Sequence, residues 1–179
     1  STKNAMRRII ITMLVALAIF LPSSLQAGVE HLLPKVQVLE RTGKAPFILH
    51  RAINITYSNG AVQCPLLEEF FIENGCTLAG KGAAVKVSLV KSIKGAHDYA
   101  LHGYENEAYT LKVSANKILI EAVTNIGVIR ATQTLMQLAE GCEKGNETIA
   151  AVKITDWPAF KLRGYMHDTG RSYIPVDEL

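Results

Sequence analysis

The sequence predicts an α+β fold in which two helices cover one face of a β-sheet. Apolar residues make up 49% of the 179 residues, enough to bury the core of one domain of ordinary size. Segments in which apolar and polar residues alternate, as is typical of strands, are interspersed with two segments whose apolar residues recur at helical spacing. No internal repeat or low-complexity tract interrupts this pattern, so a collagen-like or disordered chain is excluded.

Residues 1–27 are predicted to be a signal peptide with a few leading residues. Arg7 and Arg8 form a charged head, residues 9–21 form an apolar run, and small residues precede Gly28. Because the run is shorter than the roughly 20 residues of a spanning helix, we expect no stable membrane span after cleavage. The alternative is an uncleaved amino-terminal anchor. Cleavage implies a periplasmic or secreted protein.

The first elements after this segment are two strand regions and a helix. Residues 35–41 alternate apolar and polar side chains and end at Gly43, which predicts a half-buried strand and a turn. Residues 47–57 predict a second strand region. Pro65 is tolerated in the first turn of a helix that ends near Gly75. The apolar residues of this helix recur at helical spacing: Leu66, Leu67, Phe70 and Phe71.

The second half of the chain contains a hairpin and the most regular helix. Residues 85–90 predict a third strand, and residues 109–114 and 117–122 predict a hairpin around Ala115-Asn116. Residues 125–140 predict an amphipathic helix that ends at Gly141, with one apolar face made by Val128, Ala131, Leu135 and Leu138. A further strand is expected at 149–154.

Charge argues against nucleic acid as a partner. Three of the 19 basic residues and none of the 16 acidic residues fall within residues 1–27, so the body of the chain is neutral. No cluster of lysine and arginine is interleaved with aromatic residues along the sequence. The chain therefore offers little electrostatic attraction for a phosphate backbone, and we expect no nucleic-acid binding.

Two local motifs resemble ligand sites without completing them. Residues 75–81 have the glycine and lysine spacing of a phosphate-binding loop, but Gly82 replaces the Ser or Thr, and a helix precedes the loop. We interpret it as a helix-to-strand connection. His97, Asp98 and His102 lie in a polar, glycine-flanked segment that favours a solvated connection over a metal site. We therefore expect neither a metal nor a cofactor.

The odd number of cysteines argues against a scaffold built from disulfides. Cys64, Cys76 and Cys142 are the three cysteines of the chain. Buried free thiols that pack as small apolar residues are the favoured interpretation. The alternative in an oxidising compartment is one disulfide with one thiol left over.

The carboxyl-terminal segment combines charges and aromatic residues around a short strand-like core. We expect Arg163, Asp168 and Arg171 to cluster around this strand and the loop after it. A guanidinium there can make paired hydrogen bonds to adjacent hydroxyls or carboxylates. The alternative is an Asp168–Arg171 pair that only holds the loop.

Several of these segments carry a resemblance to a known family. Residues 109–113, 118–122 and 127–138 resemble the amino-terminal accessory domain of family 20 glycoside hydrolases, the β-N-acetylhexosaminidases. Residues 154–160 and 163–171 resemble the entry into that family's catalytic (β/α)8 barrel. The resemblance therefore implies a three-part division of the chain: 1–27 as signal peptide, 28–158 as the accessory domain and 159–179 as the truncated start of the barrel.

The resemblance also implies an activity and a site. Such enzymes hydrolyse terminal N-acetylglucosamine or N-acetylgalactosamine residues with retention, and the acetamido oxygen of the substrate attacks the anomeric carbon. Arg163 matches the family's arginine that binds hydroxyls of the terminal sugar, with Asp168 and Arg171 as possible supporting residues. The family's catalytic Asp-Glu pair lies further downstream, and Asp177-Glu178 fits the acidic first turn of a helix instead.

The resemblance leaves two functional expectations. One is that the chain is the amino-terminal portion of a β-N-acetylhexosaminidase. This portion is expected to be inactive by itself, because one strand cannot close a barrel. The other is a stand-alone, non-catalytic module that binds glycans or a partner protein.

Overall fold

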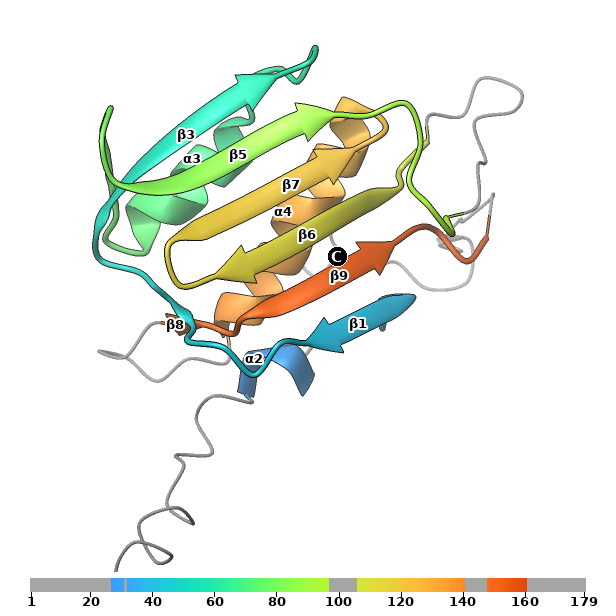
Figure 1. Cartoon of the computed structure of the whole chain (residues 1–179), viewed down its shortest axis with the longest axis horizontal. Helices are drawn as coiled ribbons and strands as arrows, with labels where there is room; N and C mark the ends of the chain where they lie inside the picture. Colours follow the sequence, from blue (N-terminus) through green and yellow to red (C-terminus); the bar gives the residue numbers. More distant parts are fainter. Residues whose placement is uncertain (1–26, 31, 97–105, 141–147, 161–179) are drawn as a thin grey trace, which may run out of the picture.

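A computed structural model describes residues 27–30, 32–96, 106–140 and 148–160. It confirms an α+β fold with a seven-stranded mixed sheet and a separate two-stranded sheet. The two long helices, α3 (Pro65–Glu73) and α4 (Asn125–Glu140), lie together behind the large sheet in Figure 1. A short helix, α2 (Ala27–Glu30), contacts α4. The helices thus leave the other face of the sheet open.

The large sheet is antiparallel in one half and parallel in the other. Its strands, in spatial order, are β1 (Val38–Arg41), β9 (Val152–Asp156), β6 (Tyr109–Ser114), β7 (Lys117–Ala122), β5 (Ala83–Leu89), β3 (Ala52–Ser58) and β4 (Thr77–Leu78). The pairs from β1 to β7 are antiparallel, and those from β7 to β4 are parallel. The parallel half needs long crossover connections, and α3 makes one of them between β3 and β5.

The core lies between the helices and the covered face of the sheet. Because side chains alternate along a strand, every second residue of each central strand points toward the helices. The central strands contribute Val85, Val87, Leu111, Ile118, Ile120 and Ile154, and the helices contribute Leu67, Phe71, Val128, Ala131, Leu135 and Leu138. All twelve are at most 1% exposed. Burial of this apolar surface is the main term that stabilises the fold.

Two glycines allow close approaches that a side chain would block. Gly75 follows α3 with φ +72°, and a Cβ there would collide with the imidazole ring of His50. Gly127 lies in the first turn of α4, where a Cβ would lie 2.8 Å from the carbonyl oxygen of Ala108. Gly127 therefore sets how closely α4 packs on the chain before β6.

The structure confirms both long helices and the hairpin but corrects three strand predictions. Residues 35–41 were expected to be half-buried, whereas β1 is an exposed edge strand beside β9. The predicted strand region 47–57 is two strands in different sheets, because His50 has φ +57° and turns the chain between β2 (Phe47–Ile48) and β3. The predicted strand 149–154 is likewise divided between β8 (Thr148–Ile149) and β9, and β8 pairs with β2.

The connection between α3 and β5 contains a strand that the sequence did not predict. Residues Thr77 and Leu78 form β4, which extends the sheet beside β3. The segment is otherwise the expected helix-to-strand connection. A phosphate-binding loop must be followed directly by a helix, whereas this segment is followed by the strand β5.

Candidate functional site

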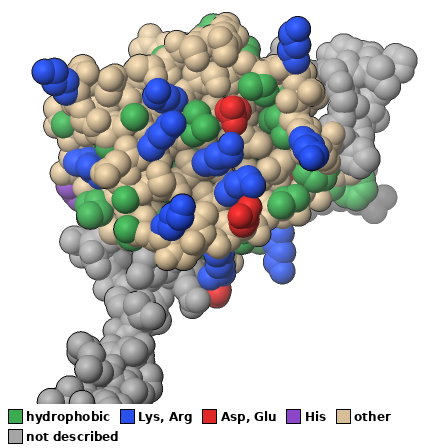
Figure 2. Space-filling view, viewed as in Figure 1, with side chains coloured by type: hydrophobic (Ala, Val, Ile, Leu, Met, Phe, Trp, Pro, Cys, Tyr) green, Lys and Arg blue, Asp and Glu red, His purple; other side chains and the backbone are tan. Residues whose placement is uncertain are grey.

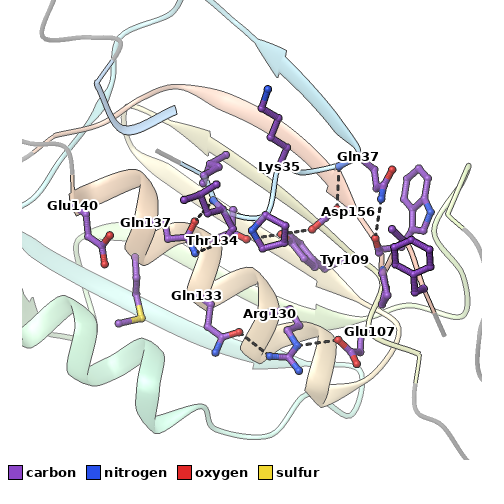
Figure 3. A pocket seen from close by; sticks show the side chains of 18 residues that line it. Lys35, Gln37, Glu107, Tyr109, Arg130, Gln133, Thr134, Gln137, Glu140 and Asp156 are labelled. Carbon is purple, nitrogen blue, oxygen red and sulfur yellow. Dashed lines mark hydrogen bonds and ion pairs between the residues drawn. The ribbon is translucent and has the colours of Figure 1, made fainter. Parts of the chain in front are cut away.

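A hollow lies beside the outer surface of α4, next to the last described residues of the chain. It is a groove with a cavity volume of about 580 Å³. Three segments form most of its walls: residues 32–37, the outer side of α4, and residues 156–160, which end β9 and continue beyond it. Glu107 and Tyr109 complete the lining. Figure 3 shows side chains from these three segments converging on the groove. The last described residues of the chain thus line this groove.

A hydrogen-bonded chain of three side chains forms one wall of the groove. Tyr109 and Asp156 are register partners on β6 and β9, and the Tyr109 hydroxyl donates to Asp156 Oδ2 at 3.2 Å. The Thr134 hydroxyl on α4 lies 2.5 Å from the Tyr109 oxygen (Figure 3). Burial raises the pKa of Tyr109 well above its usual value, and the Asp156 carboxylate raises it further. Tyr109 is therefore a neutral donor that joins the sheet to α4.

The segment before β1 is held against the same wall. The backbone N–H of Gln37 donates to Asp156 Oδ1 at 3.0 Å. Gln137 on α4 accepts from the Leu33 backbone N–H at 2.8 Å and donates to the Leu33 carbonyl at 3.0 Å. These bonds fix the amino-terminal side of the groove to α4 and to the end of β9.

The opposite end of the groove carries an ion pair. Arg130 Nε donates to Glu107 Oε2 at 2.9 Å, and its terminal nitrogen donates to Gln133 Oε1 at 3.0 Å. Glu107 is 19% exposed at its side chain, which shields the pair partly from solvent. The acidic groups Glu107 and Asp156 are thus both engaged in holding the walls together.

Two of the acidic side chains in the described part of the groove are engaged in its own walls. Of its three carboxylates, Glu107 and Asp156 accept hydrogen bonds from other wall residues, whereas Glu140 at the end of α4 is exposed. No Ser, Cys or His is among the described residues that line it. Among the described residues, no group of three His, Cys, Asp or Glu side chains is placed to hold a metal ion. The groove is suited to binding another part of a protein.

Apolar side chains on the helical side of the domain support this interpretation. Leu33 is 74% exposed and Phe160 is 71% exposed, and both line the groove. A second, smaller hollow of about 170 Å³ lies between the amino-terminal ends of α3 and α4 and is lined by Val62 and Ile129. Val62 is also more than half exposed. Exposed apolar side chains beside a hollow are typical of an interaction surface.

The predicted sugar-binding residues fall outside the described residues. Arg163, Asp168 and Arg171 lie in residues 161–179, as does Asp177-Glu178. His97, Asp98 and His102 also lie outside the described ranges, as does Cys142. Their expected roles therefore stay predictions.

Other expectations fall on described residues. Cys64 and Cys76 are buried free thiols, as predicted. None of the helices in the described ranges has the length and apolar character needed to cross a membrane. The groove residues Tyr109, Thr134 and Gln137 were not predicted, because their meeting depends on the packing of α4 against strands that are distant in sequence.

Comparison with known proteins identifies a protein family that this chain matches. The family model described as glycosyl hydrolase family 20, domain 2, matches residues 30–157. A β-N-acetylhexosaminidase from Cellulomonas fimi is 27% identical over 157 residues. The match covers 82% of this chain and 30% of that protein.

Solved structures agree with the sequence comparison. A family 20 exo-β-N-acetylglucosaminidase from Vibrio harveyi, in complex with N-acetylglucosamine, is 25% identical with a TM-score of 0.62. That match covers 88% of this chain and 23% of the Vibrio chain. A β-N-acetylhexosaminidase from Bacteroides fragilis is also 25% identical, with a TM-score of 0.57 over 82% of this chain and 28% of its own. The chain thus spans less than a third of the length of these relatives.

Proposed function

Because the chain belongs to glycosyl hydrolase family 20, of which it forms an amino-terminal part, we propose that it serves an exported β-N-acetylhexosaminidase. The substrate class is glycans that end in N-acetylglucosamine or N-acetylgalactosamine. The observation that carries the proposal is the family match over residues 30–157, and the sequence resemblance of residues 163–171 to the entry of the catalytic barrel extends it. Residues 1–27 provide the export signal in this proposal.

In the proposed reaction the acetamido oxygen of the substrate attacks the anomeric carbon, and the leaving glycosidic oxygen takes a proton. The Asp-Glu pair that orients the acetamide and supplies this proton belongs to the barrel beyond residue 179. Arg163, within the first barrel strand that the resemblance places at residues 162–168, donates hydrogen bonds to hydroxyls of the terminal sugar. Residues 1–179 contain Arg163 but not the proton donor, so we expect them to be inactive without the rest of the barrel.

The groove beside α4 has a role in the same proposal. Because residues 156–160 line the groove and lead directly into residue 161, the next domain begins beside it. The exposed Leu33 and Phe160 and the apolar hollow at Val62 offer that domain a surface to cover. We infer that residues 28–158 support the barrel through this helical side.

The test is an activity assay on the continued reading frame. Protein that extends through the barrel is expected to release p-nitrophenol from p-nitrophenyl β-N-acetylglucosaminide, and residues 1–179 alone are not. A continued reading frame without an adjacent Asp-Glu pair after a barrel strand, or an extended protein without this activity, contradicts the proposal.

The non-catalytic alternative predicts a different result. A module that binds glycans by itself would bind N-acetylglucosamine oligomers at micromolar concentrations without the barrel. Calorimetry on the 179-residue chain separates the two hypotheses. The hydrogen bonds that Tyr109 makes with Thr134 and Asp156, and Gln137 with Leu33, use these polar groups within the groove walls and so favour the supporting role.

A further inference from the structure

The open face of the seven-stranded sheet carries lysines in register. Lys86 on β5, Lys112 on β6 and Lys153 on β9 belong to one row across the sheet, in which Leu119 of β7 stands between Lys86 and Lys112. With strands about 4.8 Å apart, the row spans roughly 14 Å. Lys117 faces the same side of the sheet, two residues before Leu119 on β7. Figure 2 shows this face from the front, with blue side chains outnumbering red ones.

The charge on this face is positive although the body of the chain is neutral. Among the described strand residues that face this side, four are lysines and two are glutamates, Glu40 and Glu121. Lys153 pairs with Glu40 at 3.0 Å, and Lys112 pairs with Glu121 at 3.4 Å. The ammonium groups of Lys86 and Lys117 make no ion pair with a described residue.

The row places like charges next to each other. Lys112 and Lys153 are direct register partners on adjacent antiparallel strands, an arrangement that is locally unfavourable. All four lysine side chains are exposed, so none is needed to fill the core. Glu121 and Glu40 offset part of this repulsion, whereas Lys86 and Lys117 have no described carboxylate partner and are the ammonium groups that an anionic ligand can neutralise.

We propose that this open face, defined by Lys86, Lys112, Lys117 and Lys153, binds a polyanionic polysaccharide. Sulfate or carboxylate groups of the polymer pair with the ammonium groups, which bind as point charges and tolerate irregular spacing. Polar side chains on the same face, on the lysine strands and on β3 beside them, can hydrogen-bond to sugar hydroxyls: Asn54, Thr56, Ser88, Thr110, Ser114 and Thr155. The proposal is independent of the hydrolase activity.

The composition of the face distinguishes this ligand from other polyanions. Binding of single-stranded nucleic acid relies on aromatic side chains on which bases stack, and no described strand residue on this side is aromatic. Insertion into a membrane surface relies on large apolar side chains, and Leu119 is the largest that faces this side within the central strands. A flat, hydroxylated and cationic face suits an extended anionic glycan.

The experiment measures binding of the full 179-residue chain to immobilised dextran sulfate, with uncharged dextran as the matched polymer. The test variant is K86Q/K112Q/K153Q. The control variant is K35Q/R41Q/R130Q. Lys35 and Arg130 line the groove, and Arg41 pairs with Glu30 of α2. Each variant removes three positive charges and breaks two ion pairs, so net charge and lost pairs are matched.

We expect the wild-type chain to bind dextran sulfate but not dextran. The row variant should bind about 100-fold more weakly, because each lysine near an anionic surface contributes roughly a factor of five. The control variant should change less than about threefold, since Lys35 and Arg130 line the groove on the helical side and Arg41 is directed to Glu30 of α2. Circular dichroism checks that both variants are folded.

Three outcomes overturn the proposal. One is wild-type binding that does not distinguish dextran sulfate from dextran. Another is an equal loss in the row and control variants, which would mean that net charge alone attracts the polymer. The third is tighter binding to vesicles that contain phosphatidylglycerol than to dextran sulfate, lost in the row variant, which would assign the face to a membrane.

Discussion

The hydroxyl of Tyr109 donates a hydrogen bond to the carboxylate of Asp156 across the neighbouring strands β6 and β9, at 3.2 Å. Asp156 is the last residue of β9, so its side chain lies where the chain leaves the sheet. The same phenol contacts Thr134 on α4. One buried side chain therefore links the exit of the domain to the helix that lines the groove.

Replacing Tyr109 with Phe should destabilise the domain by about 1–3 kcal/mol. The substitution keeps the ring in the core but leaves Asp156 and Thr134 with one partner fewer. Urea unfolding followed by circular dichroism measures the change. Tyr57→Phe is the matched control, because the Tyr57 hydroxyl is only partly buried and its loss should be milder. Equal effects of the two substitutions would contradict the role given to Tyr109.

Tyr57 predicts a loss of stability at alkaline pH. Burial raises its pKa to about 12, and the nearby Glu68 carboxylate also raises it, while the Cys64 backbone N–H opposes the shift. In the unfolded chain tyrosine ionises near pH 10. Between these values only the unfolded state has lost the proton, so rising pH favours unfolding. The contribution of Tyr57 is complete below about pH 10 and is lost as pH rises through about 12.

The measurement is the difference in unfolding free energy between wild type and Tyr57→Phe across this alkaline range. The difference should shrink with increasing pH, because Phe has no proton to lose. Lysines also titrate in this range, but they are common to both proteins and drop out of the comparison. A difference that stays constant with pH would show that Tyr57 ionises equally easily in the folded and unfolded states.

Gly127→Ala should destabilise the domain by about 1–3 kcal/mol, although alanine is the better helix former. The new methyl group would lie 2.8 Å from the Ala108 carbonyl oxygen and 3.0 Å from the Ala122 Cβ, so α4 must shift away from the sheet. Gly80→Ala is the control, since a Cβ there meets nothing within 4 Å. Thermal unfolding should show a lower midpoint for the first variant alone. Equal midpoints would mean that α4 has room to move.

Arg163→Ala, introduced into a protein that extends through the barrel, should lower kcat/KM at least about 100-fold, because hydrogen bonds from a charged donor to the sugar are lost. Arg171→Ala, at the supporting position, should have a smaller effect. Steady-state hydrolysis of p-nitrophenyl β-N-acetylglucosaminide measures both. An Arg163 variant with unchanged kcat/KM removes this residue from the sugar site.

Elements with a strong local pattern were predicted correctly from the sequence. The hairpin of β6 and β7 follows from two alternating segments around Ala115-Asn116, and α4 follows from its 3.6-residue period. The division of residues 47–57 into two strands was missed, because nothing in the apolar pattern marks the left-handed backbone of His50. β4 was missed because a strand of two residues is too short to show an alternating pattern.

The groove and the lysine row depend on contacts that no local pattern contains. Tyr109 meets Thr134 and Asp156 only after α4 packs on the sheet. The lysines of the open face occur singly on separate strands, so the sequence shows no basic cluster. The register of β5, β7, β6 and β9 brings three of them into one row.

The pairing of β1 with β9 has a consequence for how the protein is made. Val38 lies opposite Thr155, so the first strand of the sheet has its only strand neighbour among the described residues almost a whole domain later. During synthesis, the nascent segment that contains β1 must wait unpaired until residues 152–156 have left the ribosome. Closing so long a loop is slow, and the domain completes its sheet only when its last strand arrives.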